Sequence, residues 1–277
     1  MSVLRTLKKV GLFIKRDFIM MWSYKFAFFI SYLYMFLFIF IFIALGTWAT
    51  AFGGAGPFGG PHYEGGGGFI LFILLGSIGW SYQWSIASVG SAAIRREMMM
   101  GTIESIFQTP TSLYTVITSY TLFGMFNGTI QMLLYLMVGY FAFDVNIAGN
   151  WVYGIIILLL SLLMMFGLNL LFSGLNIHIK EIGSVIPLLQ MGSLFLCEVY
   201  IPLSLLPESM QTVSKLLPFY YAISSLRSVL AFEVTFDVFL QKFVLMSCLA
   251  GAFLIVGALF FRYAVGKAKD NGNLSYY

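Results

Sequence analysis

The sequence RREMMMGTIESIFQTP, residues 95–110, stands between long apolar runs and carries charges that those runs lack. Its apolar residues at helical spacing (i, i+4, i+7 and i+8) are Met99, Ile103, Ile106 and Phe107. This spacing predicts a short amphipathic helix that Pro110 ends, because the residue before a proline is pushed out of helical geometry. Such a helix between two membrane spans either lies on the lipid surface or docks into a partner protein. A solvated loop with incidental periodicity is the third alternative.

The apolar runs on both sides of this segment decide the class of protein. Hydrophobic residues make up 60% of the 277 residues and charged residues only 9%, whereas soluble domains carry about 25% charged residues. A soluble fold of this length could not bury so much apolar surface, so we predict a polytopic membrane protein. The net charge of +4 does not indicate nucleic-acid binding, because in a membrane protein the positions of the basic residues set the orientation.

Six apolar segments are candidates for crossing the bilayer, which takes about 20 residues of helix. They cover residues 26–52, 69–93, 112–143, 151–175, 182–200 and 243–261. The fifth is short and contains Pro187, so we expect it to tilt or to lead directly into structure outside the membrane. The predicted fold is therefore an all-α transmembrane domain over residues 1–277.

The segments that do not span have distinct compositions. Residues 1–25 alternate basic and apolar residues at helical spacing, which predicts an interfacial helix in the headgroup layer. Residues 53–68 are too rich in glycine for a helix or a strand, and they lack the Gly-Lys-Ser/Thr of a phosphate-binding loop. We expect a flexible external loop there. Residues 201–233 are too charged to span and too apolar for a free loop. Pro207 suits the first position of a short helix and Pro218 ends it, and a second short helix is expected over about 220–232.

The basic residues are distributed asymmetrically over these segments. All but three of the 15 Lys and Arg residues lie in the N-terminal segment, in 95–110, in the turn at Lys180 or in the C-terminal tail. The exceptions are Lys215, Arg227 and Lys242. The positive-inside rule then predicts that both termini and residues 95–110 are cytoplasmic, and that residues 201–233 are external.

A few polar residues lie inside the predicted spans. Asn127 and Gln131 share one helical face, and Asn169 is the strongly polar residue of the fourth span. A buried amide in lipid needs a partner, so these residues contact another helix or line a pathway. Glu198 could meet a cation or pair with Arg227 or Lys215. Cys197 and Cys248 are expected to be buried as small apolar residues, and no His, Cys or Asp cluster suggests a metal site.

Two motifs resemble those of ABC type-2 permeases, the membrane subunits of ATP-binding-cassette exporters. The family's cytoplasmic loop reads roughly E-(R/K)-E…G-T-(L/I)-E-x-L…T-P. It resembles Arg95-Arg96-Glu97, followed by Gly101-Thr102-Ile103-Glu104-Ser105 and Thr109-Pro110. The chain departs from it at Arg95, where an acidic residue is commoner. The sequence IPLSLLPE at 201–208, followed by Leu217-Pro218, Tyr221-Ala222 and Leu226-Arg227, resembles the segment before the last span of that family. The resemblance covers nearly the whole chain.

The resemblance implies a permease that works with a separate cytoplasmic ABC ATPase, present in two copies, which binds ATP and Mg. The chain itself has no Walker motif and no catalytic constellation, so we expect neither enzymatic activity nor a bound cofactor. A second permease chain, identical or related, would complete the pathway in the plasma membrane of a prokaryote. The implied coupling residues are Arg95, Arg96, Glu97, Gly101, Thr102, Ile103, Glu104, Ile106 and Phe107. The implied external cap comprises Pro202, Pro207, Pro218, Tyr221 and Arg227.

The cargo is constrained only by the character of the spans. They carry no acidic or basic residue at mid-depth, which argues against an ion or proton relay. They fit export of a hydrophobic or amphipathic molecule (drug-like, lipid-like or a peptide), and the loop motif is closest to the drug-efflux branch. Two alternatives remain: a non-transporting scaffold or assembly protein, and an ATP-independent channel or carrier. The second would usually show paired intramembrane charges or repeated halves.

Overall fold

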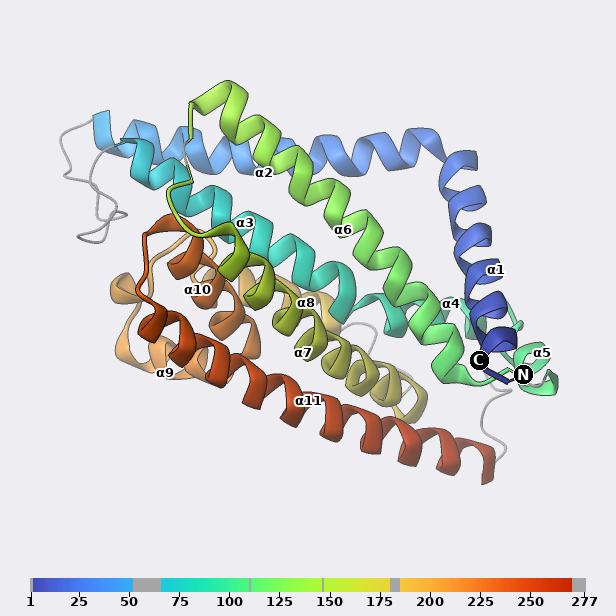
Figure 1. The fold of residues 1–277 in the computed structure, drawn as a ribbon. Coiled ribbons are helices and arrows are strands. Elements are labelled where there is room, and N and C mark those ends of the chain that lie inside the picture. The colour runs from blue at the N-terminus through green and yellow to red at the C-terminus, as the bar shows by residue number, and fades with distance from the viewer. Residues whose placement is uncertain (1, 52–65, 110, 146, 180–184, 271–277) are drawn as a thin grey trace.

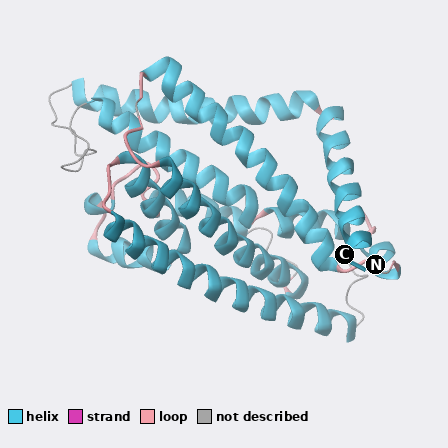
Figure 2. Ribbon diagram, in the orientation of Figure 1, coloured by secondary structure: helices cyan, strands magenta, loops and turns pink. Residues whose placement is uncertain are grey.

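The computed structural model describes residues 2–51, 66–109, 111–145, 147–179 and 185–270, and every regular element in these ranges is a helix (Figures 1 and 2). The elements are α1 (Ser2–Ser23), α2 (Lys25–Ala51), α3 (Gly66–Ala87), α4 (Val89–Met99), α5 (Ile103–Gln108), α6 (Leu113–Phe143), α7 (Trp151–His178), α8 (Val185–Leu196), η2 (Leu203–Leu205), α9 (Glu208–Leu216), α10 (Pro218–Ala231) and α11 (Phe236–Asp270). The all-α prediction is confirmed for this part of the chain.

Four helices of the described chain are long and apolar enough to cross a membrane. They are Gly68–Met99, Leu113–Phe143, Trp151–His178 and Phe236–Ala268. These correspond to the second, third, fourth and sixth predicted spans, and they make this a multi-pass membrane protein. The first predicted span forms the continuous helix α2. The fifth contains α8, whose 12 residues reach only about 18 Å at 1.5 Å per residue. The count of six spans and the sidedness of the termini stay predictions.

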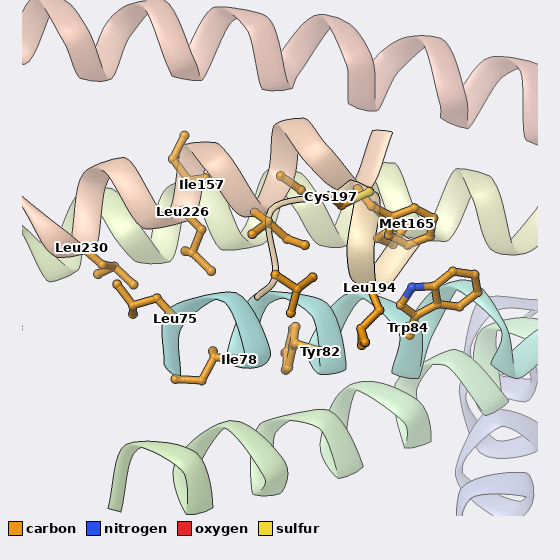
Figure 3. Packing of buried hydrophobic residues seen from close by; sticks show 14 of the residues in the cluster. Leu75, Ile78, Tyr82, Trp84, Ile157, Met165, Leu194, Cys197, Leu226 and Leu230 are labelled. Atoms are coloured by element: carbon orange, nitrogen blue, oxygen red, sulfur yellow. The ribbon is translucent and has the colours of Figure 1, made fainter. Parts of the chain in front are cut away.

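The core of the bundle lies between α3, α7, α8 and α10 (Figure 3). Apolar side chains from all four helices meet there, among them Leu75, Ile78, Trp84, Ile157, Met165, Leu194, Leu226 and Leu230. Helices α7 and α11 approach even more closely, because Gly167 and Gly257 face each other: a Cβ added at Gly257 would meet the backbone of Gly167. Small residues let helix backbones approach in this way within membranes.

Short helices close the two ends of the bundle. Figure 1 shows α5 and the beginning of α1 at the same end as the C-terminal end of α11, with α9 at the opposite end. Pro218 occupies the first turn of α10, where its missing N–H costs nothing. The expected pair of short helices within 201–233 is therefore present, and the second begins slightly earlier than predicted.

The prediction of one helix over residues 95–110 is wrong. Helix α4 continues from the second span to Met99 and ends in a turn with Gly101 at a positive φ of 67°. The N–H of Thr102 donates to the carbonyl of Glu97 over 3.0 Å, and that of Gly101 donates to Met98 over 3.0 Å. This pair of bonds is a Schellman motif, which stops a helix at a left-handed glycine. Only α5 remains as a separate short helix, and Pro110 lies outside the described residues.

Two further boundaries differ from the predictions. The last helix, α11, covers Phe236–Asp270 and extends beyond the predicted span at both ends. The glycine-rich segment 53–68 lies mostly outside the described residues, and its last glycines begin α3.

Candidate functional site

A buried carboxylate, Glu97, joins the turn before α5 to the rest of the bundle. Its Oε1 accepts hydrogen bonds from Arg16 Nη1 at 3.0 Å and from the Tyr120 hydroxyl at 2.8 Å. Its Oε2 accepts a short hydrogen bond from the Thr102 hydroxyl. Glu97 is only 6% exposed. Because the donors come from α1, α6 and the α4–α5 turn, one side chain holds three segments together; we call Arg16, Glu97, Thr102 and Tyr120 the Glu97 cluster.

Arg16 makes several contacts in addition to its hydrogen bond with Glu97. It also donates to the Tyr120 hydroxyl and lies 3.4 Å from Asp17 Oδ1. The Arg16 guanidinium stacks 5.1 Å from the centre of the Phe13 ring. Neighbouring Asp17 is 5% exposed, and burial raises the pKa of its carboxyl although the charges of Arg16 and Arg96 oppose the rise. A buried acid and a half-buried base therefore lie side by side on α1.

The predicted coupling residues separate into different environments. Arg95, Arg96 and Glu97 belong to α4, where the two arginine side chains are exposed and Glu97 is buried. Ile106 is half-buried and packs toward Ile94 and Tyr120. The backbone of Ile103, Glu104 and Phe107 forms α5, and their side chains lie outside the described part of the structure.

The seating of α5 follows from these contacts. Ile106 on α5 packs against the bundle. Thr102, the residue directly before α5, donates a hydrogen bond to Glu97. The helix is thus attached at its base by a hydrogen bond and along one face by apolar packing.

Asn169 bridges helices. It is completely buried; its Oδ1 accepts from the Gly90 N–H at 2.9 Å, and its Nδ2 donates to Thr121 Oγ1 at 2.7 Å. Two turns further along α7, Asn176 Nδ2 donates to the Ser91 carbonyl at 2.8 Å. These bonds tie α7 to α4 and α6, which favours the helix-contact alternative for Asn169.

Asn127 and Gln131 line a cavity of about 460 Å³ between α2, α3, α6 and α8. Aromatic side chains form part of its wall, namely Tyr34, Trp80, Trp84, Tyr135 and Tyr200. The indole N–H groups of Trp80 and Trp84 both donate to Ser193 Oγ, at 3.1 and 2.9 Å. Asn127 Oδ1 also accepts from the Tyr32 hydroxyl at 2.6 Å. Asn127 thus lies both at a helix contact and at the cavity wall, and Gln131 lies at the cavity wall.

A second cavity, of about 680 Å³, continues toward α5. Its lining includes Arg95, Arg96 and Asn176, and it shares Ser88 and Gln190 with the first cavity. One side of the α3–α4 helix therefore faces hollow space from the middle of the bundle to the α4–α5 turn.

At the opposite end, Glu198 pairs with Arg227. Glu198 Oε2 lies 3.9 Å from Arg227 Nη1, and Glu198 Oε1 accepts from the Leu203 N–H at 3.0 Å. Arg227 is 4% exposed, donates to the carbonyls of Glu198 and Phe72, and lies over the Phe72 ring at 3.6 Å. These contacts anchor α10 and give Glu198 the structural pairing that the sequence left as one alternative.

The other predicted cap residues shape the same region. Pro202 and Pro207 precede η2 and α9, and Pro218 begins α10. Tyr221 is half-buried and packs on the core. Cys197 and Cys248 are both free, and Cys248 is exposed rather than buried. Among the described residues no group of three or more His, Cys, Asp or Glu could hold a metal ion.

Sequence reasoning missed Arg16, Asp17 and Tyr120 as site residues. Arg16 was grouped with the other basic residues of the interfacial helix, and Tyr120 with the apolar third span. One signal was available: Asp17 is the sole acidic residue of the first 25, directly beside Arg16.

Comparison with known proteins identifies the family of the chain. None of the curated proteins compared with the chain matches it. The family model of the ABC-2 type transporter matches residues 11–231, which include α3–α10 and the whole Glu97 cluster. Members of this family are membrane subunits of ABC transporters, are not themselves the ATPase, and work with ABC ATPase partners. The chain belongs to the ABC-2 type transporter family.

Proposed function

We propose that this chain is the permease of an ATP-driven exporter and that its ATPase docks on α5. The observation that carries the proposal is the Glu97 cluster, which joins the turn at the base of α5 to α1, α4 and α6. A helix that only lay on the lipid surface would not need a buried carboxylate with three donors at its base. Removing such a charged partner is costly, because it leaves the remaining groups unsatisfied.

Movement of α5 would reach the spans through two connections. The Schellman turn at Gly101 is short and hydrogen-bonded, so a push on α5 is passed to α4 and α3. The bonds of Glu97 to Arg16 and Tyr120 would move α1 and α6 with it. ATP can shift the permease between two conformations only through contacts that differ between them, and this junction is where such contacts can act.

The cargo would use the cavity lined by Asn127 and Gln131. Its aromatic wall and amide groups suit a molecule with an apolar body and a few hydrogen-bonding groups. The second cavity offers a continuation toward α5 along Ser88 and Arg95. We further propose that a second permease chain completes this pathway. The exposed apolar side chains of α2, such as Phe29, Leu33 and Leu37, are available for contact with that chain or with lipid.

Co-purification of the full chain in detergent tests the proposal. The wild type should bring down an ABC ATPase subunit with ATP hydrolysis, and the double variant Ile103→Asp, Glu104→Arg in α5 should lose both while keeping its melting temperature. The matched control, Val213→Asp with Glu208→Arg, makes the same changes on exposed side chains of α9 at the other end and should retain the ATPase. If no ATPase is recovered, or if the α5 variant retains it, the proposal is contradicted. The result would then favour the scaffold or the ATP-independent channel or carrier.

A further inference from the structure

A third cavity, of about 400 Å³, lies in the angle between α1 and α2 and against α4 and α6. Its lining combines an acid, Asp17, and a base, Arg96, with apolar side chains that include Met20, Met21 and Phe123. Asp17 is not among the residues expected to contact the ATPase or the cargo. Arg96 is one of the implied coupling residues and also borders the second cavity. This cavity therefore calls for its own explanation.

Asp17 lines this cavity and, within the described chain, has a buried carboxylate oxygen without a hydrogen-bond partner. The side chain is 5% exposed, and among the described residues Oδ2 has no hydrogen-bond partner. Oδ1 has only the long contacts of 3.4 Å to Arg16. A buried carboxylate oxygen without a donor is unfavourable, so a ligand that carries N–H donors into the cavity would be stabilised there.

Arg96 restricts the kind of ligand. Its side chain is exposed, lines the same cavity, and makes no ion pair with another described residue. A purely cationic ligand would be repelled by it, and a purely anionic ligand would be repelled by Asp17. The charges of Arg16, Arg96, Asp17 and Glu97 sum to zero around the site, which favours a ligand that is neutral overall but has separated charges.

The surroundings indicate an amphiphile at headgroup depth. Helix α1 is amphipathic, and its predicted place is the headgroup layer. The methionine and phenylalanine side chains of the lining offer an apolar surface beside the charged pair. A phosphodiester suits a guanidinium, and a primary ammonium can give Asp17 Oδ2 the hydrogen bond that a quaternary ammonium cannot.

We propose that this cavity binds the headgroup of a zwitterionic phospholipid with a primary ammonium, such as phosphatidylethanolamine. Asp17 receives the ammonium, Arg96 receives the phosphate, and the acyl chains lie along Met20, Met21 and Phe123. The bound lipid holds α1 against α4 and α6 beside the Glu97 cluster. This site does not depend on the proposed transport function, because it requires only that the chain is embedded in a bilayer.

Native mass spectrometry of the delipidated full chain tests this site. Phosphatidylethanolamine, phosphatidylcholine and phosphatidylglycerol with identical acyl chains are titrated separately in detergent. We expect phosphatidylethanolamine to bind the wild type at least about tenfold more tightly than the other two, since loss of one charge-assisted hydrogen bond is of this size. Asp17→Asn and Arg96→Gln should each remove this preference.

Two control variants separate this effect from a general loss of charge. Arg95→Gln removes the neighbouring arginine, which borders the second cavity but not this one, and Asp237→Asn removes an exposed acid of α11. Both should bind phosphatidylethanolamine as the wild type does. Since the Arg96 side chain is exposed, its variant keeps the test valid even if Asp17→Asn unfolds.

Three outcomes would overturn the proposal. Equal binding of phosphatidylcholine and phosphatidylethanolamine would show that the ammonium is not recognised by Asp17. A preference for phosphatidylglycerol would indicate a site for anions only. If the Arg96→Gln variant bound phosphatidylethanolamine more tightly than the wild type does, the cavity would take a cationic amphiphile instead.

Discussion

Arg16 Nη1 lies 3.0 Å from Glu97 Oε1, although the two residues are 81 positions apart in the chain. This contact joins the N-terminal helix to the last turn of α4, directly before the turn that leads to α5. Tyr120 donates to the same oxygen from α6. The contact therefore places the proposed ATPase-docking helix α5, the N-terminal helix α1 and two candidate spans in one hydrogen-bonded unit.

Glu97→Gln should lower the free energy of unfolding by about 1–3 kcal/mol, because it removes the charge that satisfies Arg16 and Tyr120. Arg16→Gln should cost less, since the Arg16 side chain is 38% exposed. The double variant should lose less than the sum of the two, with an interaction of about 0.5–3 kcal/mol. Denaturant titrations in detergent measure all three. Arg262→Gln on α11 is the control, and strictly additive losses would show that the pair is not coupled.

Gly101→Ala should destabilise the α4–α5 turn, because a side chain at a φ of 67° is strained. The cost for a residue with a Cβ in the left-handed region is about 1–2 kcal/mol. Gly101→Asn should cost less, since asparagine tolerates this conformation better. Melting temperatures and ATP hydrolysis with the partner would be measured together. Identical behaviour of the alanine and asparagine variants would argue against the Schellman turn.

Asp17→Asn should stabilise the protein at neutral pH in detergent without phospholipid. Burial raises the pKa of Asp17, so the folded protein retains this proton to a higher pH than the unfolded chain does. The ionised carboxyl therefore opposes folding above the folded-state pKa, and the penalty disappears below the unfolded value of about 3.9. The melting temperature of the variant should exceed that of the wild type at pH 7, with the difference gone near pH 4. Asp237→Asn should show no gain that depends on pH.

Gly257→Ala should separate α7 and α11, because its Cβ would meet the backbone of Gly167. Overpacking of this kind costs about 1–3 kcal/mol. On the same helix, a Cβ at Gly251 would meet nothing within 4 Å, so Gly251→Ala should be neutral or slightly stabilising. Unfolding in detergent distinguishes the two, and equal effects would contradict the close approach of these helices.

Local chemistry was enough to predict much of the helical framework from the sequence. Long apolar runs identified the four helices that are long enough to span, and Pro218 predicted the end of the first short helix within 201–233, which is α9. These features depend on neighbouring residues only. The break at Gly101 was missed because apolar spacing continued across it, although the glycine itself marks a common helix end.

Contacts between distant segments could not be predicted in the same way. Periodicity assigns Asn169 to the inside of a span, but it does not indicate that the partner is the backbone of Gly90. The pairing of Arg16 with Glu97 likewise depends on how α1 crosses α4 and α6. Position within a segment shows that a polar group needs a partner, and only the packed structure identifies it.

Cysteine accessibility tests the central claim most directly, namely that Glu97 couples α5 to the cavity-lining helices. Ser88, which borders the first and the second cavity, is changed to cysteine in a chain that also carries Cys248→Ser. The rate of maleimide labelling of this chain with its bound ATPase is then measured with and without ATP. We predict that ATP changes the labelling rate with native Glu97 and with the control Glu208→Gln. With Glu97→Gln, the ATPase should stay bound and the labelling rate should no longer respond to ATP. An unchanged ATP response in Glu97→Gln would contradict the account.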